Sequence, residues 1–328
     1  MKFGSNWLRS AGLAVALAGT LGTMQSPAIA QQYPNQEIRL ICAFPAGSGA
    51  DVLVRYFAEK LRPIVGRPVI VENKAGAGGL IATEFVARSK PDGYTIYVHA
   101  ATSVALSMYL VKNPPVDVAK TIQVAATINR QPHMLLVDAK SPYKTVAELT
   151  AAMKAKGDKA TYATASPIST IMGEIYKNAT GVAAVEVPYK SAPESLNEIP
   201  SGKIDYAMHD PVFSLAQQRE GRMRILAVSA GTRLAASPDL PTMNELGVAM
   251  DLTGWWAAMV PMGTPKPVID QINKWFVEIV SSDETKKFLN GFGGDPFINT
   301  PEKAQAMFLQ AIGDWGAHVK AAKIEPQG

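Results

Sequence analysis

Short apolar runs alternate with longer segments of mixed polarity from Glu37 almost to the end of the chain. The runs predict strands over residues 37–44, 68–72, 94–100, 134–137, 161–165, 185–189, 204–209 and 224–229. The segments between them are long enough for helices, and strands that alternate with helices are typical of a parallel sheet with crossover helices. The pattern therefore predicts an α/β fold built on mainly parallel sheets flanked by helices.

Several of the predicted helices have recognisable ends. Thr145 and Glu148 form a capping box that opens one helix, and Gly157 can close it. Thr300 and Pro301 supply the N-cap and the first-turn proline of another. Apolar side chains at positions 269, 272, 276 and 279 recur at helical spacing, so we expect that helix to pack against the core.

The first 30 residues have a different pattern. Lys2 and Arg9 precede an apolar run over residues 11–21, which is too short to span a bilayer because a spanning helix needs about 20 apolar residues. The small residues Ala28 and Ala30 flank Ile29 and make a cleavage site. We interpret residues 1–30 as a secretory signal peptide cleaved after Ala30. The residue directly after that site is Gln31 and not a cysteine, so a bacterial lipid anchor is not expected.

Removing 30 of the 328 residues leaves 298, enough for one large or two medium domains. The sequence contains no long linker, so two lobes would be joined by short crossings that act as a hinge. Proline or glycine interrupts the pattern near residues 129–132 and 249–254, where we place the crossings. We therefore expect one lobe over residues 31–130 and 252–328, and a second over residues 131–251.

Composition and charge exclude several classes of protein. Hydrophobic residues make up 47% and charged residues 18% of the chain, as in globular proteins. The net charge of +4 falls to +2 without Lys2 and Arg9, which is too small for a nucleic-acid surface. The four histidines are scattered, which argues against a zinc site, and the single Cys42 is expected to be a buried strand residue. We expect no metal, cofactor or nucleic-acid partner.

The most informative stretch follows the first predicted strand and reads Phe44-Pro45-Ala46-Gly47-Ser48-Gly49-Ala50-Asp51. Its glycines let main-chain N–H groups approach a ligand, and the helix that begins behind them favours an anion at its N-terminus. Open α/β sheets bind ligands beyond the carboxyl ends of their strands. The stretch therefore predicts a carboxylate or phosphate site, with a plain tight turn as the alternative. Asp51 is either the N-cap of the helix or a ligand contact.

Two glycine-rich motifs fail as catalytic or cofactor sites. Ser48 has Ala46 and Ala50 where a nucleophile elbow needs glycine, and the loop lacks a Walker ending. The second cluster, over residues 76–79, has Ile81 where a dinucleotide fingerprint needs its third glycine. With no nucleophile, metal or cofactor motif, the sequence does not predict an enzyme.

A series of motifs runs in order along nearly the whole mature chain, and together they are specific. The series is Tyr33-Pro34, the stretch 44–51, Val69-Ile70-Val71-Glu72-Asn73-Lys74, Gly76-Ala77-Gly78-Gly79, Pro91-Asp92-Gly93-Tyr94-Thr95, Val187-Pro188-Tyr189-Lys190, Leu226-Ala227-Val228, Asp239-Leu240-Pro241-Thr242 and Gly263-Thr264-Pro265. In these motifs the chain resembles the Bug family of solute receptors of tripartite tricarboxylate transporters.

The resemblance implies a two-lobed fold of the type II periplasmic-binding-protein kind, with a small carboxylate held between the lobes. It implies a periplasmic receptor that hands its ligand to membrane permease subunits, and we expect a monomer. A receptor that docks on a periplasmic sensor protein is the alternative. Family members commonly grip the carboxylate between the first glycine-rich loop and a serine- and glycine-rich loop of the other lobe, through main-chain donors and water.

The opposing loop departs from the family pattern, because residues 164–170 lose glycines and gain Pro167, which has no N–H. The hydroxyls of Ser166, Ser169 and Thr170 either replace the lost donors or only cap the next helix. The sequence leaves open whether the ligand is a dicarboxylate or an aromatic acid.

Other candidates each have a structural alternative. Ser103 and Asp210 either border the cleft or serve as helix N-caps, and His209 either tunes selectivity or is structural. Trp255 and Trp256 either clamp a ligand or, as we prefer, pack in the core beside a strand over residues 257–261. The family motifs add Gly78 and Tyr189. The expected ligand-binding residues are Phe44, Ala46, Gly47, Ser48, Gly49, Asp51, Gly78, Ser103, Ser166, Pro167, Ser169, Thr170, Tyr189, His209 and Asp210.

Overall fold

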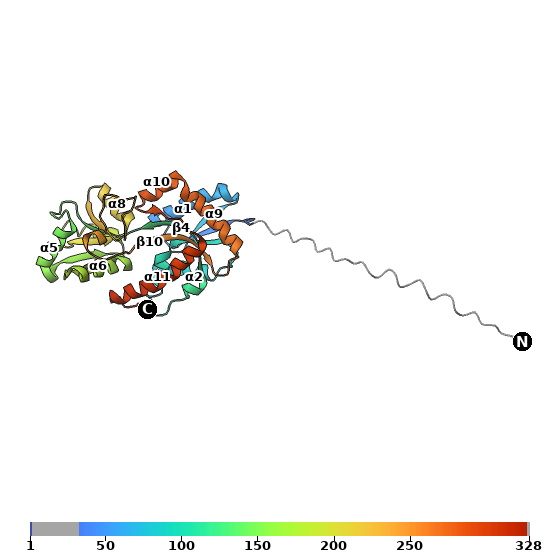
Figure 1. The fold of residues 1–328 in the computed structure, drawn as a ribbon, viewed down its shortest axis with the longest axis horizontal. Helices are drawn as coiled ribbons and strands as arrows, with labels where there is room; N and C mark the ends of the chain where they lie inside the picture. The colour runs from blue at the N-terminus through green and yellow to red at the C-terminus, as the bar shows by residue number, and fades with distance from the viewer. Residues whose placement is uncertain (2–32, 327–328) are drawn as a thin grey trace.

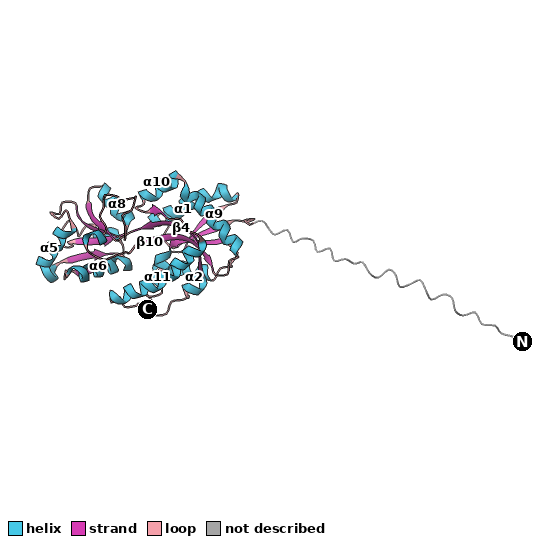
Figure 2. Ribbon diagram, in the orientation of Figure 1, coloured by secondary structure: helices cyan, strands magenta, loops and turns pink. Residues whose placement is uncertain are grey.

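The computed structural model describes Met1 and residues 33–326. Apart from Met1, the expected signal peptide and its cleavage site lie outside the described residues. The described chain forms two α/β lobes, each built on one sheet flanked by helices, that lie side by side along the long axis (Figures 1 and 2). The two-lobed α/β class predicted from the sequence is confirmed. No helix in the described part is long and apolar enough to cross a membrane.

The first lobe contains a six-stranded sheet with the order β11-β4-β10-β3-β1-β2. Its strands are β1 (Ile38–Cys42), β2 (Val69–Asn73), β3 (Thr95–Ala100), β4 (Ile122–Gln131), β10 (Gly254–Pro261) and β11 (Asp295–Pro296). Neighbouring residues of a strand point to opposite faces. Leu40 therefore packs with α1 (Gly49–Val65) and α9 (Lys266–Ser281), while Ile41 packs with α2 (Leu80–Ala87), α3 (Ala101–Ser107) and α11 (Pro301–Ala321). Both faces of the sheet are thus covered by helices.

Two more α-helices and one 3₁₀ turn belong to the described part of this lobe. The short α4 (Val118–Thr121) leads directly into β4, and α10 (Asp283–Gly291) follows α9. A single 3₁₀ turn, η1 (Ala77–Gly79), precedes α2. The end of α10 lies near the boundary with the second lobe, where a Cβ on Gly293 would lie 2.8 Å from Cβ of Pro211.

The second lobe contains a five-stranded sheet with the order β7-β6-β8-β5-β9. Its strands are β5 (Met134–Asp138), β6 (Thr161–Thr164), β7 (Val185–Pro188), β8 (Tyr206–His209) and β9 (Met223–Val228). Its helices are α5 (Val146–Lys156), α6 (Pro167–Thr180), α7 (Ala192–Ser195) and α8 (Pro211–Arg219), with the 3₁₀ turns η2 (Gly157–Lys159) and η3 (Asn244–Leu246). Figure 1 shows α5, α6 and α8 at one end of the long axis and α1, α2 and α9 at the other.

The chain passes between the sheets twice in the described part. β4 leads into β5 through Pro132 and His133, and the segment after β9 returns to β10. A polar contact also joins that returning segment to the first lobe, because the carboxylate of Asp295 accepts hydrogen bonds from the N–H groups of Ala235 (2.9 Å) and Ala236 (2.8 Å). The two lobes therefore also contact each other outside the two crossings.

Most of the predicted elements are confirmed, including all the predicted strands, the capping box of Thr145, the stop at Gly157 and the N-cap of Thr300. The mainly parallel sheets are a correction, since both sheets are mixed. In each sheet the antiparallel central strand, β10 or β5, is the one that enters from the other lobe. The pattern of apolar residues carries no information on strand direction, which explains the error.

Two predicted helix caps are also wrong. Ser48, and not Asp51, is the N-cap of α1, because the Ser48 hydroxyl accepts a hydrogen bond from the Asp51 N–H. Ala100, and not Ser103, occupies the N-cap position of α3, which places Ser103 inside the helix. Asp210 is the N-cap of α8, as one of its two interpretations proposed.

Candidate functional site

A cavity of about 640 Å³ lies between the two lobes, and residues of both line it. The starts of α1, α6 and α8 open onto it through Ser48 and Gly49, Ser166 and Asp210, and the short helices α3 and α7 also begin there. Of the residues predicted from the sequence, it is lined by Phe44, Ser48, Gly49, Ser103, Ser166, Ser169, His209 and Asp210. The structure thus brings together residues that lie up to 166 positions apart in the sequence, from Phe44 to Asp210.

The start of α1 offers main-chain donors to this cavity. Gly47 has a φ of +82°, in the left-handed region that favours glycine, and its N–H donates to Oδ2 of Asp51 at 2.8 Å. The N–H groups of Gly49 and Ala50 have no acceptor among the described residues, as expected for the first residues of a helix. Both residues line the cavity. Two adjacent donors at the positive end of a helix of 17 residues therefore face it.

The carboxylate of Asp51 stabilises this loop through hydrogen bonds. Its carboxylate is buried and accepts hydrogen bonds from Nε of Arg55 at 2.8 Å, from Nδ2 of Asn73 at 2.7 Å and from Gly47 N–H. Burial opposes ionisation, but these hydrogen bonds outweigh it and hold the pKa of Asp51 below its usual range. Asn73 also donates to the carbonyl of Phe44 at 2.9 Å. The network fixes both ends of the loop that presents Ser48 and Gly49.

The start of α6 faces the cavity from the second lobe. The Ser166 hydroxyl accepts a hydrogen bond from Ser169 N–H at 3.2 Å and lies 2.9 Å from the Ser169 hydroxyl. It also lies 3.4 Å from Nε2 of His133, which lines the cavity. Pro167 has no N–H, so Ile168 carries the first main-chain donor of this helix. Ser166 therefore caps the helix and borders the cavity, and its donation to a ligand stays a prediction.

The start of α8 adds polar groups without a positive charge. Oδ1 of Asp210 accepts a hydrogen bond from Phe213 N–H at 3.0 Å, and removal from bulk water raises the pKa of this carboxyl. The ring of His209 is buried, with Nε2 2.9 Å from the Ser195 hydroxyl. Its Nδ1 has no hydrogen-bond partner in the described part of the chain. Burial, together with the nearby His133, lowers the pKa of His209 to about 4, so its ring is neutral near pH 7.

Aromatic side chains form much of the remaining lining. They are Phe44, Phe213, Trp255, Trp256 and Phe292. The Phe44 ring lies 6.1 Å from the Trp256 ring and 5.1 Å from the His99 ring, centroid to centroid. Trp255 and Trp256 also belong to two hydrophobic core clusters, as the preferred interpretation proposed.

The remaining predicted residues lie outside the lining. Asp51 is beneath the loop, and Ala46 and Gly47 are exposed beside it. Gly78 is in η1. Pro167 begins α6, Thr170 donates to Glu186, and the Tyr189 hydroxyl donates to Glu198. Contact of these residues with a ligand stays a prediction.

Sequence reasoning missed several lining residues, notably Gln131, His133, Ser191, Phe213 and Phe292. Gln131 and His133 lie at the crossing from β4 to β5, which the sequence had indicated as a hinge but not as a wall of the site. Phe213 and Phe292 belong to different lobes, and no local motif connects them. Only the three-dimensional arrangement brings them to the same cavity.

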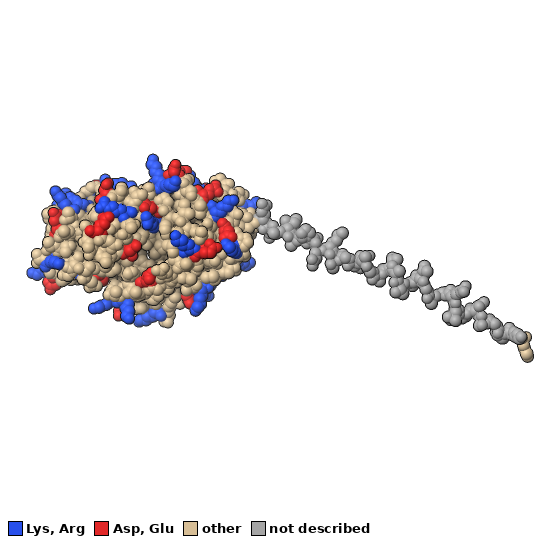
Figure 3. Space-filling view, in the orientation of Figure 1, with Lys and Arg blue, Asp and Glu red and all other residues tan. Residues whose placement is uncertain are grey.

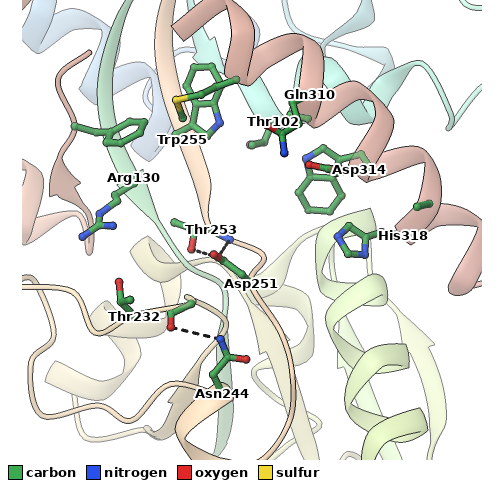
Figure 4. A pocket seen from close by; sticks show the side chains of 16 residues that line it. Thr102, Arg130, Thr232, Asn244, Asp251, Thr253, Trp255, Gln310, Asp314 and His318 are labelled. Atoms are coloured by element: carbon green, nitrogen blue, oxygen red, sulfur yellow. Dashed lines mark hydrogen bonds between the residues drawn. The ribbon is translucent and has the colours of Figure 1, made fainter. Parts of the chain in front are cut away.

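A second, more polar cavity of about 770 Å³ lies beside α11 (Figure 4). Arg130, Asp251, Asp314 and His318 line it, and none of the ligand-binding residues predicted from the sequence does. Figure 4 shows Asp314 and His318 projecting from the same helix. The two cavities share only Thr102 and Trp255 among their lining residues.

Acidic and basic side chains are intermixed over the face of the molecule seen in Figure 3. Within the described residues, no group of three or more His, Cys, Asp or Glu side chains is placed to hold a metal ion. The polar groups that converge on the 640 Å³ cavity are chiefly main-chain N–H groups, hydroxyls and neutral imidazoles. This arrangement suits reversible binding of a small anion.

Residues 53–323 match the family model described as tripartite tricarboxylate transporter family receptor. The chain belongs to this family. A curated relative, a UPF0065 protein of Bordetella bronchiseptica, is 31% identical to the receptor over 313 residues, which cover 94% of this chain and 93% of the relative. The Bug-family resemblance inferred from the sequence motifs is thereby confirmed.

Solved structures agree with this assignment. The periplasmic binding protein BugD is 30% identical, with a TM-score of 0.76, and the match covers 90% of the receptor and 100% of BugD. The structure of R. palustris Rpa4515 with adipate is 26% identical, with a TM-score of 0.80, and the match covers 90% of the receptor and 100% of that chain. Both share the two-lobed fold described above.

Proposed function

We propose that this receptor binds a small organic carboxylate in the 640 Å³ cavity between its lobes and delivers it, as a periplasmic monomer, to the permease subunits of a tripartite tricarboxylate-type transporter. The observation that carries the proposal is the pair of unpartnered N–H groups of Gly49 and Ala50 at the start of α1, judged against the described residues. They face the cavity and can donate to the two oxygens of one carboxylate. Adipate in the related Rpa4515 structure supports a carboxylate ligand.

Electrostatics also favours a carboxylate at the N–H groups of Gly49 and Ala50. The partial positive charge of a helix N-terminus favours an anion, and the effect falls off within the first turn. α1 and α6, of 17 and 14 residues, both begin at the cavity and come from opposite lobes. A carboxylate at Gly49 would therefore be attracted by both helix starts once the lobes are closed.

We propose that the lobes divide as expected from the sequence, with residues 31–130 and 252–328 in one and 131–251 in the other. The two sheets support these borders, because β4 ends at Gln131, β5 begins at Met134 and β10 begins at Gly254. The crossings would then act as the hinge about which the cavity opens and closes.

We also propose that the receptor does no chemistry on its ligand. The serine and histidine that lie closest to a nucleophile–base pair are Ser195 and His209, but Ser195 is fully buried and its hydroxyl donates to the carbonyl of Ala192 at 2.8 Å. That serine is therefore in no position to attack a ligand in the cavity. After incubation with the purified receptor, a bound carboxylate should be recovered unchanged.

Isothermal titration calorimetry on residues 31–328 tests the carboxylate proposal. Small carboxylates should bind and raise the melting temperature by mass action, while the matched primary amides and alcohols should not. Binding of the amides or alcohols with no carboxylate binding would overturn it. Gel filtration at micromolar concentration tests the monomer, and uptake by permease-bearing vesicles with and without the loaded receptor tests delivery.

A further inference from the structure

The charged side chains around the cavity bear on how many charges its ligand can carry. None of the described residues that line it is a lysine or arginine. The nearby Arg55 donates to Asp51, and Arg130 lies 3.7 Å from Asp295 and lines the other cavity. The lining does include one acid, Asp210. A ligand in this cavity therefore meets no cationic side chain of the described chain and one carboxyl group.

The two histidines of the lining do not supply the missing charge. Burial lowers the pKa of His133 and of His209 to about 4 in each case, so both rings are neutral near pH 7. Nε2 of each ring already faces a serine hydroxyl, Ser166 for His133 and Ser195 for His209. They can exchange single hydrogen bonds with a ligand, but they do not neutralise a carboxylate.

The wall beyond the α1 start is apolar and aromatic. The rings of Phe44, Phe213, Trp255, Trp256 and Phe292 come from both lobes, and Leu53, Ile168 and Val212 add aliphatic surface. Such a wall favours a flat apolar body, because aromatic rings in contact gain energy beyond the area they bury. It disfavours an ion, because a buried charge without a partner loses its hydration uncompensated.

We infer that this receptor selects an aromatic monocarboxylate, a ligand with one charged group at Gly49 and Ala50 and a flat ring against the aromatic wall, in preference to di- and tricarboxylates. The inference rests on the proposed function, that a carboxylate occupies this cavity. The first carboxylate receives the free main-chain donors of α1. A second carboxylate would have to leave water for a wall in which the described residues supply no cation. Gln131, Ser103 and Ser191 remain to bind one neutral polar substituent.

Calorimetry with three matched pairs of ligands tests the inference. Benzoate against benzene-1,4-dicarboxylate and hexanoate against adipate differ by one carboxylate, and benzoate against cyclohexanecarboxylate differs in aromaticity. We expect the monocarboxylate of each charge pair to bind about tenfold more tightly or better, and benzoate to bind more tightly than cyclohexanecarboxylate. Tighter binding of both dicarboxylates would overturn the single charge, and equal or tighter binding of cyclohexanecarboxylate would overturn the aromatic preference.

These outcomes are distinct from a failure of the proposed function. If none of these acids binds while benzamide or benzyl alcohol does, the cavity is not a carboxylate site, and the proposed function falls. If the acids bind in the wrong order, the carboxylate site stands and only the inferred ligand class falls.

A charge variant gives an independent readout. Gln131 lines the cavity, is partly exposed and is not one of the α1 residues proposed to bind the carboxylate. Gln131→Lys therefore adds a cation to the cavity lining at a polar position. It should raise the affinity for adipate about tenfold relative to hexanoate, which is the effect expected of a nearby unit charge at moderate dielectric. Gln131→Met, of similar length and without charge, is the control and should not change the ratio. An unchanged ratio in a folded Gln131→Lys protein would show that the lack of cations does not set the selectivity.

Discussion

Gly49 of the first lobe lies against Val212 of the second, and we expect this contact to limit how far the cavity can close. A Cβ built on Gly49 would lie 3.3 Å from Cγ1 of Val212, slightly inside the best separation of two carbon atoms, which is about 3.5–4.0 Å. Gly49 has no positive φ and is the first residue of α1, so valine can adopt its backbone conformation. Gly49→Val would place two more methyl groups against Val212 in the closed form.

The expected magnitude follows from overpacking. Extra methyl groups in a well-packed contact cost about 1–3 kcal/mol. That cost applies only when the lobes are closed on a ligand, so it should appear as a loss of about 5- to 150-fold in affinity. The free energy of unfolding without ligand should change little, because the open protein can separate the two side chains. Val212→Ala in the double variant should restore most of the affinity.

Calorimetric titration and urea unfolding on the wild type, both single variants and the double variant complete a cycle that measures the coupling directly. Gly66→Ala is the control, since Gly66 closes α1 with a φ of +63° away from the cavity. It should lower stability by about 1 kcal/mol and leave affinity unchanged. Unchanged affinity in Gly49→Val, or no restoration by Val212→Ala, would refute the closure contact.

Other variants test the structure elsewhere. Asp51→Asn should lower the free energy of unfolding at pH 7 by about 1–3 kcal/mol, because it weakens three hydrogen bonds. The pKa of Asp51 is depressed in the folded protein, so urea titrations should show the difference from wild type shrinking as the pH falls below about 4. Gly173→Ala should destabilise the fold by about 1–3 kcal/mol, since its Cβ would meet the Tyr162 ring. Gly313→Ala, in the middle of α11 with open space around it, should stabilise the fold by up to about 1 kcal/mol. Thermal unfolding should show the melting temperature falling in the first variant and rising in the second, and a shift in the same direction would contradict the packing. Burial lowers the pKa of His99 to about 3, so below about pH 6.5 the unfolded chain binds a proton at this ring that the folded chain does not bind. The wild type should therefore lose stability between pH 7 and pH 5, and His99→Gln should lose up to about 2 kcal/mol less than the wild type does. Urea titrations at the two pH values measure the difference.

The elements that could be predicted from the sequence are those with a local signal. Apolar runs marked the strands, and Thr145, Gly157 and Thr300 marked helix ends. The strand β4 was missed because its ten residues mix apolar side chains with polar ones such as Asn129, which is buried. Strand direction was also beyond reach, since an apolar run reads the same in a parallel or an antiparallel pairing.

The candidate site divides in the same way. The loop at Ser48 and Gly49 could be found because glycines between a strand and a helix have a local meaning. The hydrogen bond from Asn73 could not, because Asn73 reaches Asp51 from β2, whereas Arg55 lies one turn after Asp51 in α1. Of the aromatic wall, the sequence indicated Phe44 and offered Trp255 and Trp256 as a clamp. Phe213 and Phe292 could not be found, since they belong to different lobes and line the same cavity only in the folded chain.

Pro167 and Pro211 begin α6 and α8, two of the second-lobe helices that open onto the cavity, and neither has an N–H to give. The start of α1 consequently offers a main-chain donor at its first helical residue, which the starts of α6 and α8 lack. We expect capture to occur in two steps, in which the open protein first holds the anion at α1 and the second lobe then swings over it. Release would run in reverse. A transporter that moves the second lobe away would expose a ligand still bound to the first lobe. To take up the ligand, the transporter would then compete with the two main-chain donors of Gly49 and Ala50.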